Sequence, residues 1–387
     1  MLTQLINGRI LTPQGWIKDG SVLISNGKIL EVTNSDLAVI GAKVIDVKGM
    51  NIVPGFVGMH IHGGGGHDYT ECTAEAFNTA TNSHLLHGAT TVFPTLSSTT
   101  IDNIRCAAGL CEELMKANKV IKGLHIEGPY LNPRMAGAQW SDVLKEPVRE
   151  EYVSLIEDFS CIKRWDISPE FEGGYDFGRY VSSKGILAAV THTEAEYNEI
   201  KEAFGAGFTH AAHFYNAMPG FHKRREYKYE GTVESVYLTD GMSVEVIADG
   251  RHLPATILKL VYKLKGVENT CLVTDALKYA AFDGEVNDGR YVIENDVCRL
   301  ADTSSLAGSL ATMDKLVNTM VNKANIPVED AVRMASETPA RILGIDSCKG
   351  TLQKGKDADI VVLDDKINVR CVFSYGEIVE GTNTLIR

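Results

Sequence analysis

Short apolar runs alternate with helical patterns through the middle of this chain. Each run is four to eight residues long, as expected for a strand buried on both faces of a parallel sheet. The eight predicted strands are Ile52–Met59, Thr90–Phe93, Ile121–Ile126, Ile162–Ile167, Ile186–Val190, Phe208–Ala212, Ser243–Ile247 and Thr270–Val273. This alternation favours an α/β fold of the (β/α)8 TIM-barrel type over an open doubly wound sheet, because no GxGxxG turn opens a helix.

Both ends of the chain carry short β runs in place of this alternation. Asn7-Gly8 and Asn26-Gly27 are typical of hairpin turns near the start, and Tyr375-Gly376 is turn-prone near the end. Neither end has enough strands to close a core alone, so we predict that the two ends pair into one small β-sandwich domain. The predicted division assigns residues 1–51 and 351–387 to this domain and residues 52–350 to the barrel.

The composition narrows the classes of partner. A hydrophobic content of 44% over 387 residues is ample for a large core. The formal charge of −12 and the pI near 5.4 argue against nucleic acid or an anionic membrane surface, so an anionic substrate must be held by local donors. Eight scattered cysteines without a CxxC pair, and the lack of any apolar run long enough to span a membrane, predict a cytoplasmic protein with reduced thiols.

Polar side chains follow the predicted strands at the point where each strand ends. The stretch from Gly185 to Met218 is the clearest case, because His192 follows one apolar run and His213 follows the next. The same position after other strands is taken by His60, His62, Glu127, Asp249, His252 and Asp275. The carboxyl ends of barrel strands face one opening, where barrel enzymes build their active sites. We therefore predict that these side chains converge.

Four histidines and a glutamate at one opening are ligands typical of Zn²⁺ or Fe²⁺. Each feature alone has a simpler interpretation. His60 and His62 could form a polar strand end, and Glu127 could be a surface carboxylate at the turn before Gly128-Pro129. Asp275 could cap a helix. The pattern as a whole favours a catalytic divalent metal.

Several motifs along the chain point to one known group of enzymes. The motifs are Pro54-Gly55-Phe56 before His60-Ile61-His62-Gly63, His125-Ile126-Glu127-Gly128-Pro129-Tyr130, His213-Phe214-Tyr215-Asn216-Ala217-Met218, Ile247-Ala248-Asp249-Gly250-Arg251-His252, Thr274-Asp275-Ala276, Leu306-Ala307-Gly308-Ser309 and Gly355-Lys356-Asp357-Ala358-Asp359-Ile360. With these motifs the chain resembles the metal-dependent amidohydrolase superfamily and, within it, the N-acetylglucosamine-6-phosphate deacetylase family. The HxH and Gly-x-x-Ala-Asp pieces specify only the superfamily, whereas the other motifs are more specific.

The resemblance implies a set of roles at the metal centre. Glu127, His192 and His213 would hold the main ion, either Zn²⁺ or Fe²⁺. His60 and His62 match a second metal position that only some relatives have. Asp275 would be the catalytic acid and base, and His252 would polarise the substrate carbonyl.

The resemblance also implies how the substrate is held. The sugar phosphate would be bound by Asn216 and Ala217, together with the residues Ala138, Gln139, His252, Leu306, Ala307 and Gly308. An arginine would reach the phosphate in the neighbouring subunit of a homodimer, and Arg224 or Arg225 could fill that role. Gln139 stands where several members carry histidine, which leaves the stereochemistry of the sugar open.

The implied reaction is hydrolysis of the N-acetyl group of N-acetyl-D-glucosamine 6-phosphate, giving D-glucosamine 6-phosphate and acetate. This reaction would serve amino-sugar catabolism or recycling. Three alternatives stay open: a deacetylase for the galactosamine epimer, another amidohydrolase, and a catalytically silent barrel that binds sugar phosphate. A cyclic amidase is disfavoured, because such enzymes usually carry a carboxylated lysine after the fourth strand and here Asp166-Ile167-Ser168-Pro169 offers none.

Overall fold

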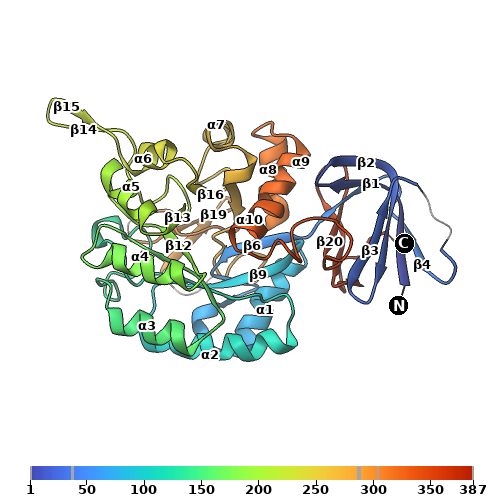
Figure 1. Cartoon of the computed structure of the whole chain (residues 1–387), viewed down its shortest axis with the longest axis horizontal. Helices are drawn as coiled ribbons and strands as arrows, with labels where there is room; N and C mark the ends of the chain where they lie inside the picture. The colour runs from blue at the N-terminus through green and yellow to red at the C-terminus, as the bar shows by residue number, and fades with distance from the viewer. Residues whose placement is uncertain (1, 36–38, 286–288, 303–304, 386–387) are drawn as a thin grey trace.

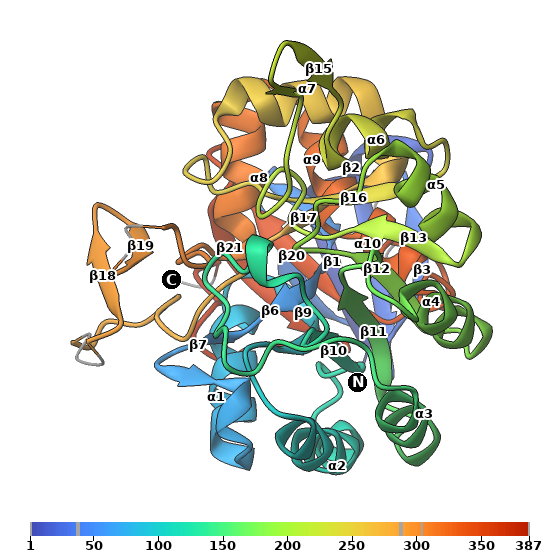
Figure 2. The ribbon, with the colours of Figure 1, turned by 90° about the vertical axis from the view of Figure 1, so that its left-hand side faces the viewer.

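The computed structural model describes residues 2–35, 39–285, 289–302 and 305–385. A barrel of parallel strands is surrounded by helices, and a sheet built from both ends of the chain lies beside it (Figure 1). Figure 2 shows the barrel turned by a quarter, with the helices arranged around the strands.

The barrel has eight strands, each of which overlaps one of the predicted runs, and they pair in parallel and in chain order. They are β6 (Phe56–Ile61), β9 (Ala89–Leu96), β10 (Leu124–Glu127), β11 (Ile162–Ile167), β12 (Leu187–Val190), β13 (Phe208–Ala211), β16 (Ser243–Ile247) and β17 (Thr270–Val273). The last strand meets the first through a parallel bridge between Ile61 and Ala276, and the Asp275 N–H donates to the His60 carbonyl at 3.1 Å. The predicted barrel fold is confirmed.

The helices and the remaining short elements follow the barrel strands. The helices are α1 (Ala74–Leu85), α2 (Ile101–Ala117), α3 (Arg149–Asp158), α4 (Gly174–Ser183), α5 (Tyr197–Gly205), α6 (Thr232–Leu238), α7 (Ala255–Lys265), α8 (Met313–Asn322), α9 (Val328–Ala335) and α10 (Glu337–Ile342). Short 3₁₀ turns are η1 (Tyr69–Glu71), η2 (Pro133–Met135) and η3 (Val267–Asn269). Three hairpins are β7 (Gly63–Gly64) with β8 (His67–Asp68), β14 (His222–Arg224) with β15 (Tyr227–Tyr229), and β18 (Tyr291–Glu294) with β19 (Val297–Leu300).

The first predicted strand, Ile52–Met59, is wrong as a single element. The chain forms β5 (Asn51–Pro54), breaks at Gly55 and continues as β6. A side chain on Gly55 would place its Cβ 2.0 Å from Thr90 Oγ1, so only glycine fits where the chain enters the barrel. β5 pairs with the end strands instead of the barrel. The division at residues 51 and 350 stays a prediction, and the pairing of β5 moves our preferred first boundary to Pro54.

The end strands form one mixed sheet in the order β22–β21–β20–β5–β1–β2–β3, with β4 beside β1. Their bounds are β1 (Leu2–Thr12), β2 (Gly15–Ser25), β3 (Lys28–Thr33), β4 (Lys43–Asp46), β20 (Ile360–Leu363), β21 (Val369–Ser374) and β22 (Glu377–Ile378). The predicted pairing of the two chain ends is thus present. Leu5, Val22, Ile360 and Phe373 contribute to a core that the sheet buries by itself. The Ile29 N–H donates to the Lys356 carbonyl at 2.9 Å, so β3 also contacts the segment before β20.

The hairpin turn predicted at Asn7-Gly8 is wrong. Both residues lie inside β1, and the pairing of β1 with β2 shifts on each side of Gly8. Asn7 has a positive φ of 56°, as in a bulge, and a Cβ on Gly8 would lie 2.5 Å from Ile52 Cδ1. The Asn26-Gly27 turn is present, since Ser25 pairs with Lys28 across it.

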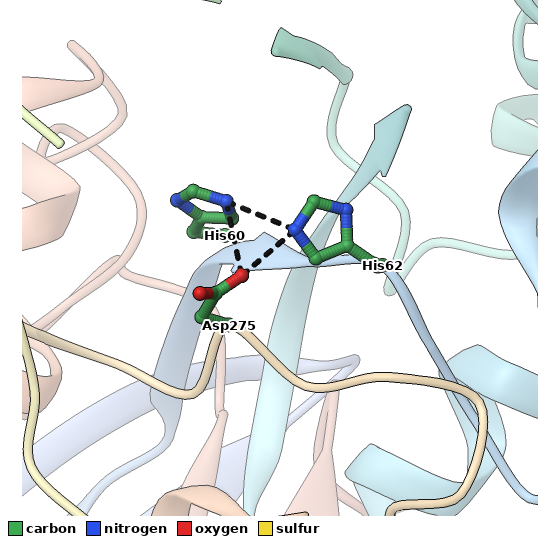
Figure 3. Close-up of side chains that lie close together, drawn as sticks. All are labelled: His60, His62 and Asp275. Carbon is green, nitrogen blue, oxygen red and sulfur yellow. Dashed lines mark hydrogen bonds and ion pairs between the residues drawn. The ribbon is translucent and has the colours of Figure 1, made fainter. Parts of the chain in front are cut away.

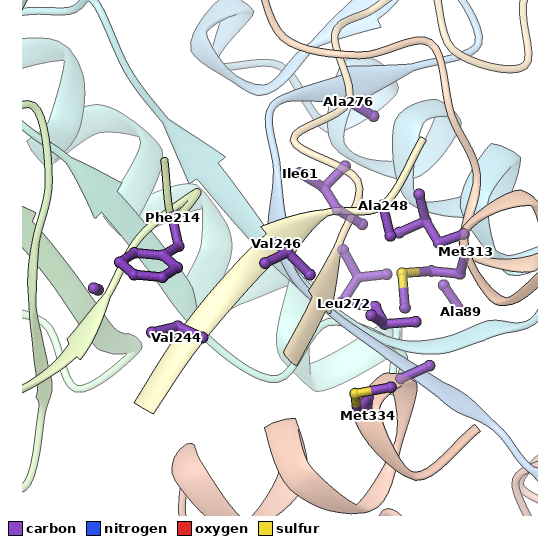
Figure 4. Packing of buried hydrophobic residues seen from close by; sticks show 14 of the residues in the cluster. Ile61, Ala89, Phe214, Val244, Val246, Ala248, Leu272, Ala276, Met313 and Met334 are labelled. Atoms are coloured by element: carbon purple, nitrogen blue, oxygen red, sulfur yellow. The ribbon is translucent and has the colours of Figure 1, made fainter. Parts of the chain in front are cut away.

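The main core lies between the barrel strands and the surrounding helices. Leu272 on β17 shares one buried cluster with Met313 of α8 and Met334 of α9 (Figure 4). Truncating a fully buried side chain of this size to alanine costs about 2–5 kcal/mol. This packing fixes the strand that precedes Asp275. None of the helices in the described ranges is long and apolar enough to cross a membrane.

Candidate metal centre and active site

A cavity of about 620 Å³ opens at the carboxyl ends of the barrel strands. Its lining includes most of the residues that the sequence singles out: His62, Glu127, Ala138, Gln139, His192, His213, Asn216, Ala217, His252, Asp275, Leu306, Ala307 and Gly308. Glu127 is the last residue of β10, and His62, His192, His213 and Asp275 follow the ends of β6, β12, β13 and β17 within two residues. The predicted convergence at one opening is therefore present.

Glu127, His192 and His213 form the first group of ligand atoms. Glu127 Oε1 lies 3.0 Å from His213 Nε2 and 3.4 Å from His192 Nε2. All three residues are buried, and their ligand atoms lie within 4.8 Å of one another. A nitrogen–nitrogen–oxygen set of this kind suits a catalytic divalent ion with an open coordination position.

His60, His62 and Asp275 form a second group (Figure 3). His62 Nε2 lies 2.8 Å from Asp275 Oδ1 and 3.2 Å from His60 Nε2. His60 is on β6 and His62 follows the strand directly, and their alternate spacing places both imidazoles on one side of the chain, as predicted. Glu127 connects the groups, since its Oε2 lies 3.7 Å from His62 Nε2.

The four histidines share one arrangement of their ring nitrogens. In each ring the Nδ1 atom contacts a group that can accept its hydrogen, and the Nε2 atom points toward the carboxylates of Glu127 and Asp275. The Nδ1 contacts are His60 with Glu245 Oε1 at 2.6 Å, His62 with Ser97 Oγ at 3.1 Å, His192 with the Met135 carbonyl at 2.7 Å and His213 with the Asn216 carbonyl at 3.2 Å. Metal-binding histidines are typically held in this way. The residues present therefore fit one or two divalent ions.

The electrostatics of the site favour a cation between the two groups. Burial lowers the pKa of His62 and His213, but Asp275 and Glu127 respectively outweigh it and raise each pKa to about 9. Burial raises the pKa of Glu127, yet hydrogen bonds from His192 and His213 hold it well below its ordinary value. The carboxylates that favour a proton on Nε2 favour a metal cation in the same place.

A second polar layer lies deeper in the barrel, and the sequence analysis missed its role. Arg164 donates to Glu245 Oε2 at 2.5 Å and to Asp166 at 2.5–2.9 Å, and all three side chains are fully buried. Glu245 also accepts from the His213 N–H at 3.1 Å and contacts His60. The layer therefore supports one ligand from each metal group. A third cluster of possible ligands, His60 with His125 and Asp166, belongs to this layer because Asp166 is already paired with Arg164.

A signal for this layer was present in the sequence. Arg164 and Asp166 are two residues apart, as are His125 and Glu127, so each pair faces one side of its strand. Charged residues at alternate positions of a strand that is otherwise buried indicate a polar barrel interior.

Three of the candidate metal-ligand and acid–base residues have strained backbones. His192, His213 and Asp275 have positive φ values of 45°, 26° and 48°, which non-glycine residues rarely adopt. Each follows directly after a barrel strand or one residue later. Such conformations persist at functional sites where the surrounding structure imposes them, and no sequence pattern predicts them.

His252 and Asp249 form a pair at the cavity wall. The Asp249 carboxylate accepts from the His252 Nδ1 atom at 2.8 Å and from the His252 main-chain N–H at 2.9 Å. Burial raises the pKa of Asp249, but the contact with His252 outweighs it, so this pKa lies below the ordinary value. Because Asp249 occupies Nδ1, only Nε2 of His252 is left for a ligand in the cavity.

The predicted substrate-binding residues line this cavity from three places along the chain. They are Ala138 with Gln139, Asn216 with Ala217, and the segment Leu306–Gly308. Asn216 lies three residues after His213, and its main-chain and side-chain N–H groups both donate to the His213 carbonyl. Gly308 has a φ of 46°, and a Cβ there would lie 2.8 Å from the Asp275 carbonyl oxygen. The segment Leu306–Gly308 can therefore pass close to Asp275 only because it contains this glycine.

A model of the amidohydrolase family matches residues 51–379 of the chain. The chain belongs to the amidohydrolase family. This confirms the resemblance that the motifs predicted, and the match covers the barrel together with the strands that follow it.

Relatives of this amidohydrolase align over nearly its whole length. N-acetylglucosamine-6-phosphate deacetylase of Haemophilus influenzae is 30% identical and aligns with 97% of this chain and 98% of its own. N-acetylgalactosamine-6-phosphate deacetylase of Escherichia coli O157:H7 is 28% identical, over 96% of this chain and 97% of its own. Among solved structures, a mutant of N-acetyl-D-glucosamine-6-phosphate deacetylase from Mycobacterium smegmatis, in complex with N-acetyl-D-glucosamine-6-phosphate, has a TM-score of 0.90 at 27% identity, covering 97% of this chain and 99% of its own.

Arg224 and Arg225 do not line the cavity of their own chain in this amidohydrolase. Arg224 is on β14, where its guanidinium pairs with Glu196 and lies 4.8 Å from the centre of the Tyr229 ring. Arg225 is in the turn between β14 and β15. The hairpin extends outward from the barrel (Figure 1). A role for either arginine would therefore have to be at another molecule.

Proposed function

We propose that this amidohydrolase removes the acetyl group of N-acetyl-D-glucosamine 6-phosphate, giving D-glucosamine 6-phosphate and acetate. The supporting observation is that the Nε2 atoms of four histidines face Glu127 and Asp275 at the base of a cavity of about 620 Å³, which three of the histidines line. The relatives that align with the whole chain carry out deacetylation of amino-sugar phosphates according to their names. We place the reaction in the cytoplasm, where the eight cysteines, which form no disulfide in the structure, would stay reduced.

The proposed main ion, Zn²⁺ or Fe²⁺, would be held by Glu127, His192 and His213. A second ion would be held by His60 and His62, with Asp275 beside them. When bound, such an ion lowers the pKa of water and withdraws charge from an amide carbonyl.

Asp275 is the proposed general base and acid. Burial raises its pKa, but the charge of His60 and the hydrogen bond with His62 outweigh burial, so the pKa lies below the ordinary value of 3.8. The carboxylate is therefore ready to accept a proton from the attacking water. Asp275 then returns this proton to the amine that leaves, which makes the amine a better leaving group.

His252 is the proposed donor to the carbonyl oxygen as negative charge develops there. Asp249 accepts from Nδ1, so Nε2 donates a hydrogen bond only in the imidazolium form. A charged donor in a site with little water is the arrangement that stabilises an oxyanion most.

Local groups must hold the substrate, because the chain carries a formal charge of −12. We assign the sugar to Gln139, Asn216 and Ala217, with Ala138 and the segment Leu306–Gly308 forming the cavity wall. Arg224 or Arg225 of a neighbouring subunit would bind the phosphate in a homodimer, in line with the outward direction of the hairpin. Arginine suits this role, since its planar donors match phosphate oxygens.

A second candidate is the galactosamine epimer of the substrate. A relative named for that epimer aligns with 96% of this chain, and Gln139 stands at the cavity where several family members have histidine. An amide and an imidazole offer different donors to a sugar hydroxyl, so Gln139 is the residue at which the preference between epimers would change.

The test is acetate release from each epimer by protein of measured metal content, before and after chelation. Release from N-acetylglucosamine 6-phosphate that chelation abolishes supports the proposal. Faster release from N-acetylgalactosamine 6-phosphate would leave the proposed active site unchanged but would replace the proposed substrate with that epimer. No release from either, with metal bound, would point to another amidohydrolase substrate. A chain that takes up neither Zn²⁺ nor Fe²⁺ would instead be a silent barrel.

A further inference from the structure

The two oxygens of Glu127 face different neighbours. Oε1 lies toward the first ligand group, 3.0 Å from His213 Nε2 and 3.4 Å from His192 Nε2. Oε2 accepts a hydrogen bond from Gln139 Nε2 at 2.8 Å. Each oxygen also lies near one histidine of the second ligand group, since His62 Nε2 is 3.7 Å from Oε2 and His60 Nε2 is 3.8 Å from Oε1.

A chain of hydrogen bonds fixes which end of the Gln139 amide meets Glu127. The Trp140 main-chain N–H donates to Ser98 Oγ at 3.0 Å, and a main-chain nitrogen can only donate. The Ser98 hydroxyl accepts this hydrogen, and its own hydrogen is available to donate to Gln139 Oε1 at 2.6 Å. The Glu127 carboxylate accepts only, so the amide nitrogen of Gln139 must face it. A flipped amide would place two oxygens against each other.

The segment that carries Gln139 also orients a second ligand. The Met135 carbonyl accepts from His192 Nδ1 at 2.7 Å, four residues before Gln139. Arg290 holds the same segment by donating to the Ala138 carbonyl at 2.8 Å. Ser98 has a positive φ of 49°, so its backbone is constrained where it meets the segment.

We propose that Gln139 is a positioning residue that gives the two ligand groups unequal metal affinities. Its amide N–H occupies a lone pair of Glu127 Oε2 and turns Oε1 toward His192 and His213. The Glu127 carboxylate is then a good ligand for the first ion and a weakened one for a second ion beside His60 and His62. This inference rests on the metal sites of the proposed function.

Two neighbouring serines offer a matched pair of variants. Ser98 orients Gln139 and so acts on the first group, whereas Ser97 contacts His62 Nδ1 at 3.1 Å and so acts on the second. Both serines are half-buried, and each loses only a hydroxyl on change to alanine. A general loss of packing would affect the two variants alike, but a role in positioning predicts opposite effects.

The experiment is a titration of the chelator-treated full-length chain with Zn²⁺ against a chromophoric competitor, which yields the dissociation constant of each ion. Circular dichroism verifies that each variant is folded. In Gln139→Leu we expect the first ion to bind about 10–100-fold more weakly, as for other residues that support a ligand, while the second does not weaken. In Ser98→Ala we expect the same change by a smaller factor, so the dissociation constants of the first and second ions become more alike. In Ser97→Ala we expect the second ion to bind more weakly, so the two dissociation constants differ more.

The outcomes separate this inference from the proposed function. Folded Gln139→Leu could have the same ratio of the two dissociation constants as the parent, either because both ions bind as before or because both bind more weakly by the same factor. Either result would overturn the positioning role alone. Equal effects of Ser97→Ala and Ser98→Ala would do the same. A parent chain that takes up no Zn²⁺ would overturn both the proposed metal centre and the role of Gln139.

Discussion

Two layers of polar side chains lie inside this barrel, and they differ in how their charges are satisfied. In the deeper layer Arg164 donates to both Asp166 and Glu245, and each of these side chains is fully buried. In the upper layer His62, His213 and Glu127 line a cavity, and nitrogen atoms with ligand geometry face carboxylates. In the deeper layer, the negative charges of Asp166 and Glu245 are offset by Arg164 and neighbouring side chains of the protein itself. The upper layer is arranged to hold a further cation.

This difference shows how one kind of residue serves two purposes. Histidine and carboxylate groups occur in both layers, and Glu245 contacts His60 while it pairs with Arg164. Burial of a charge is tolerated only where a partner offsets the cost of leaving water. The deeper layer therefore holds ligands of the upper layer in position, through the contacts of Glu245 with His60 and with the His213 main chain. The Nε2 atoms of the upper layer remain available for a metal ion.

The largest effect should follow loss of a ligand in the upper layer. We expect His192→Ala to lose the main ion and to reduce deacetylation to the level of the chelated parent, because two remaining ligands bind weakly. Metal analysis and acetate release check this. His87→Ala, a half-buried histidine that pairs with Asp314 outside the cavity, is the matched control and should retain metal. A His192→Ala protein with a full complement of metal would remove His192 from the ligand set.

Loss of the proton carrier should be nearly as severe, while the main ion stays. We expect Asp275→Asn to lower kcat by about 10²–10⁴-fold, the usual contribution of a general base or acid. The ion at Glu127, His192 and His213 should remain, as metal analysis would show. Full activity in Asp275→Asn would exclude this residue from the mechanism.

A change in the deeper layer should act on stability first. We expect Arg164→Met to lower the free energy of unfolding by about 3–5 kcal/mol, because Asp166 and Glu245 would be left buried without a partner charge. Urea unfolding measures this. Arg179→Met removes an exposed arginine that pairs with Asp176 on α4, and should cost less than about 1 kcal/mol. Equal effects of the two substitutions would contradict the distinction between the layers.

The smallest expected effect is a loss of folding stability at low pH. Burial raises the pKa of Asp166, but the Arg164 charge outweighs it and holds the pKa below the ordinary value of 3.8. A carboxyl with a lower pKa in the folded chain stabilises the fold above its unfolded pKa, and the stabilisation is lost as pH falls through the folded value. The free energy of unfolding should therefore decrease below a pH of about 4. Asp166→Asn should make this decrease shallower in urea unfolding at a series of pH values, and an unchanged slope would count against the assignment.

The sequence predicted the barrel and the upper layer well, because both depend on local order along the chain. Apolar runs marked the strands, and His192, His213 and Asp275 each come two positions after a strand ends. The residues that support these ligands were harder to predict. Arg164 and Glu245 come from β11 and β16, so their pairing depends on the closure of the barrel rather than on any local pattern.

Some features had no usable sequence signal. The contact between Gln139 and Glu127 depends on how a segment without regular strands folds over the cavity. The positive φ of His192 is imposed by its surroundings. The break at Gly55 was missed because the residues on both sides are apolar, and only the position of Thr90 reveals why a glycine is needed there.

The seam between β6 and β17 has a consequence for how the protein is made. His62 and Asp275 are 213 positions apart, yet they are in contact across the two strands that close the barrel. A growing chain emerges from the ribosome with His60 and His62 long before Asp275 exists. The second ligand group is therefore complete only after most of the chain has been synthesised. A truncated or incompletely closed chain has only the two histidines of that group, and uptake of a second ion would report that the barrel has closed.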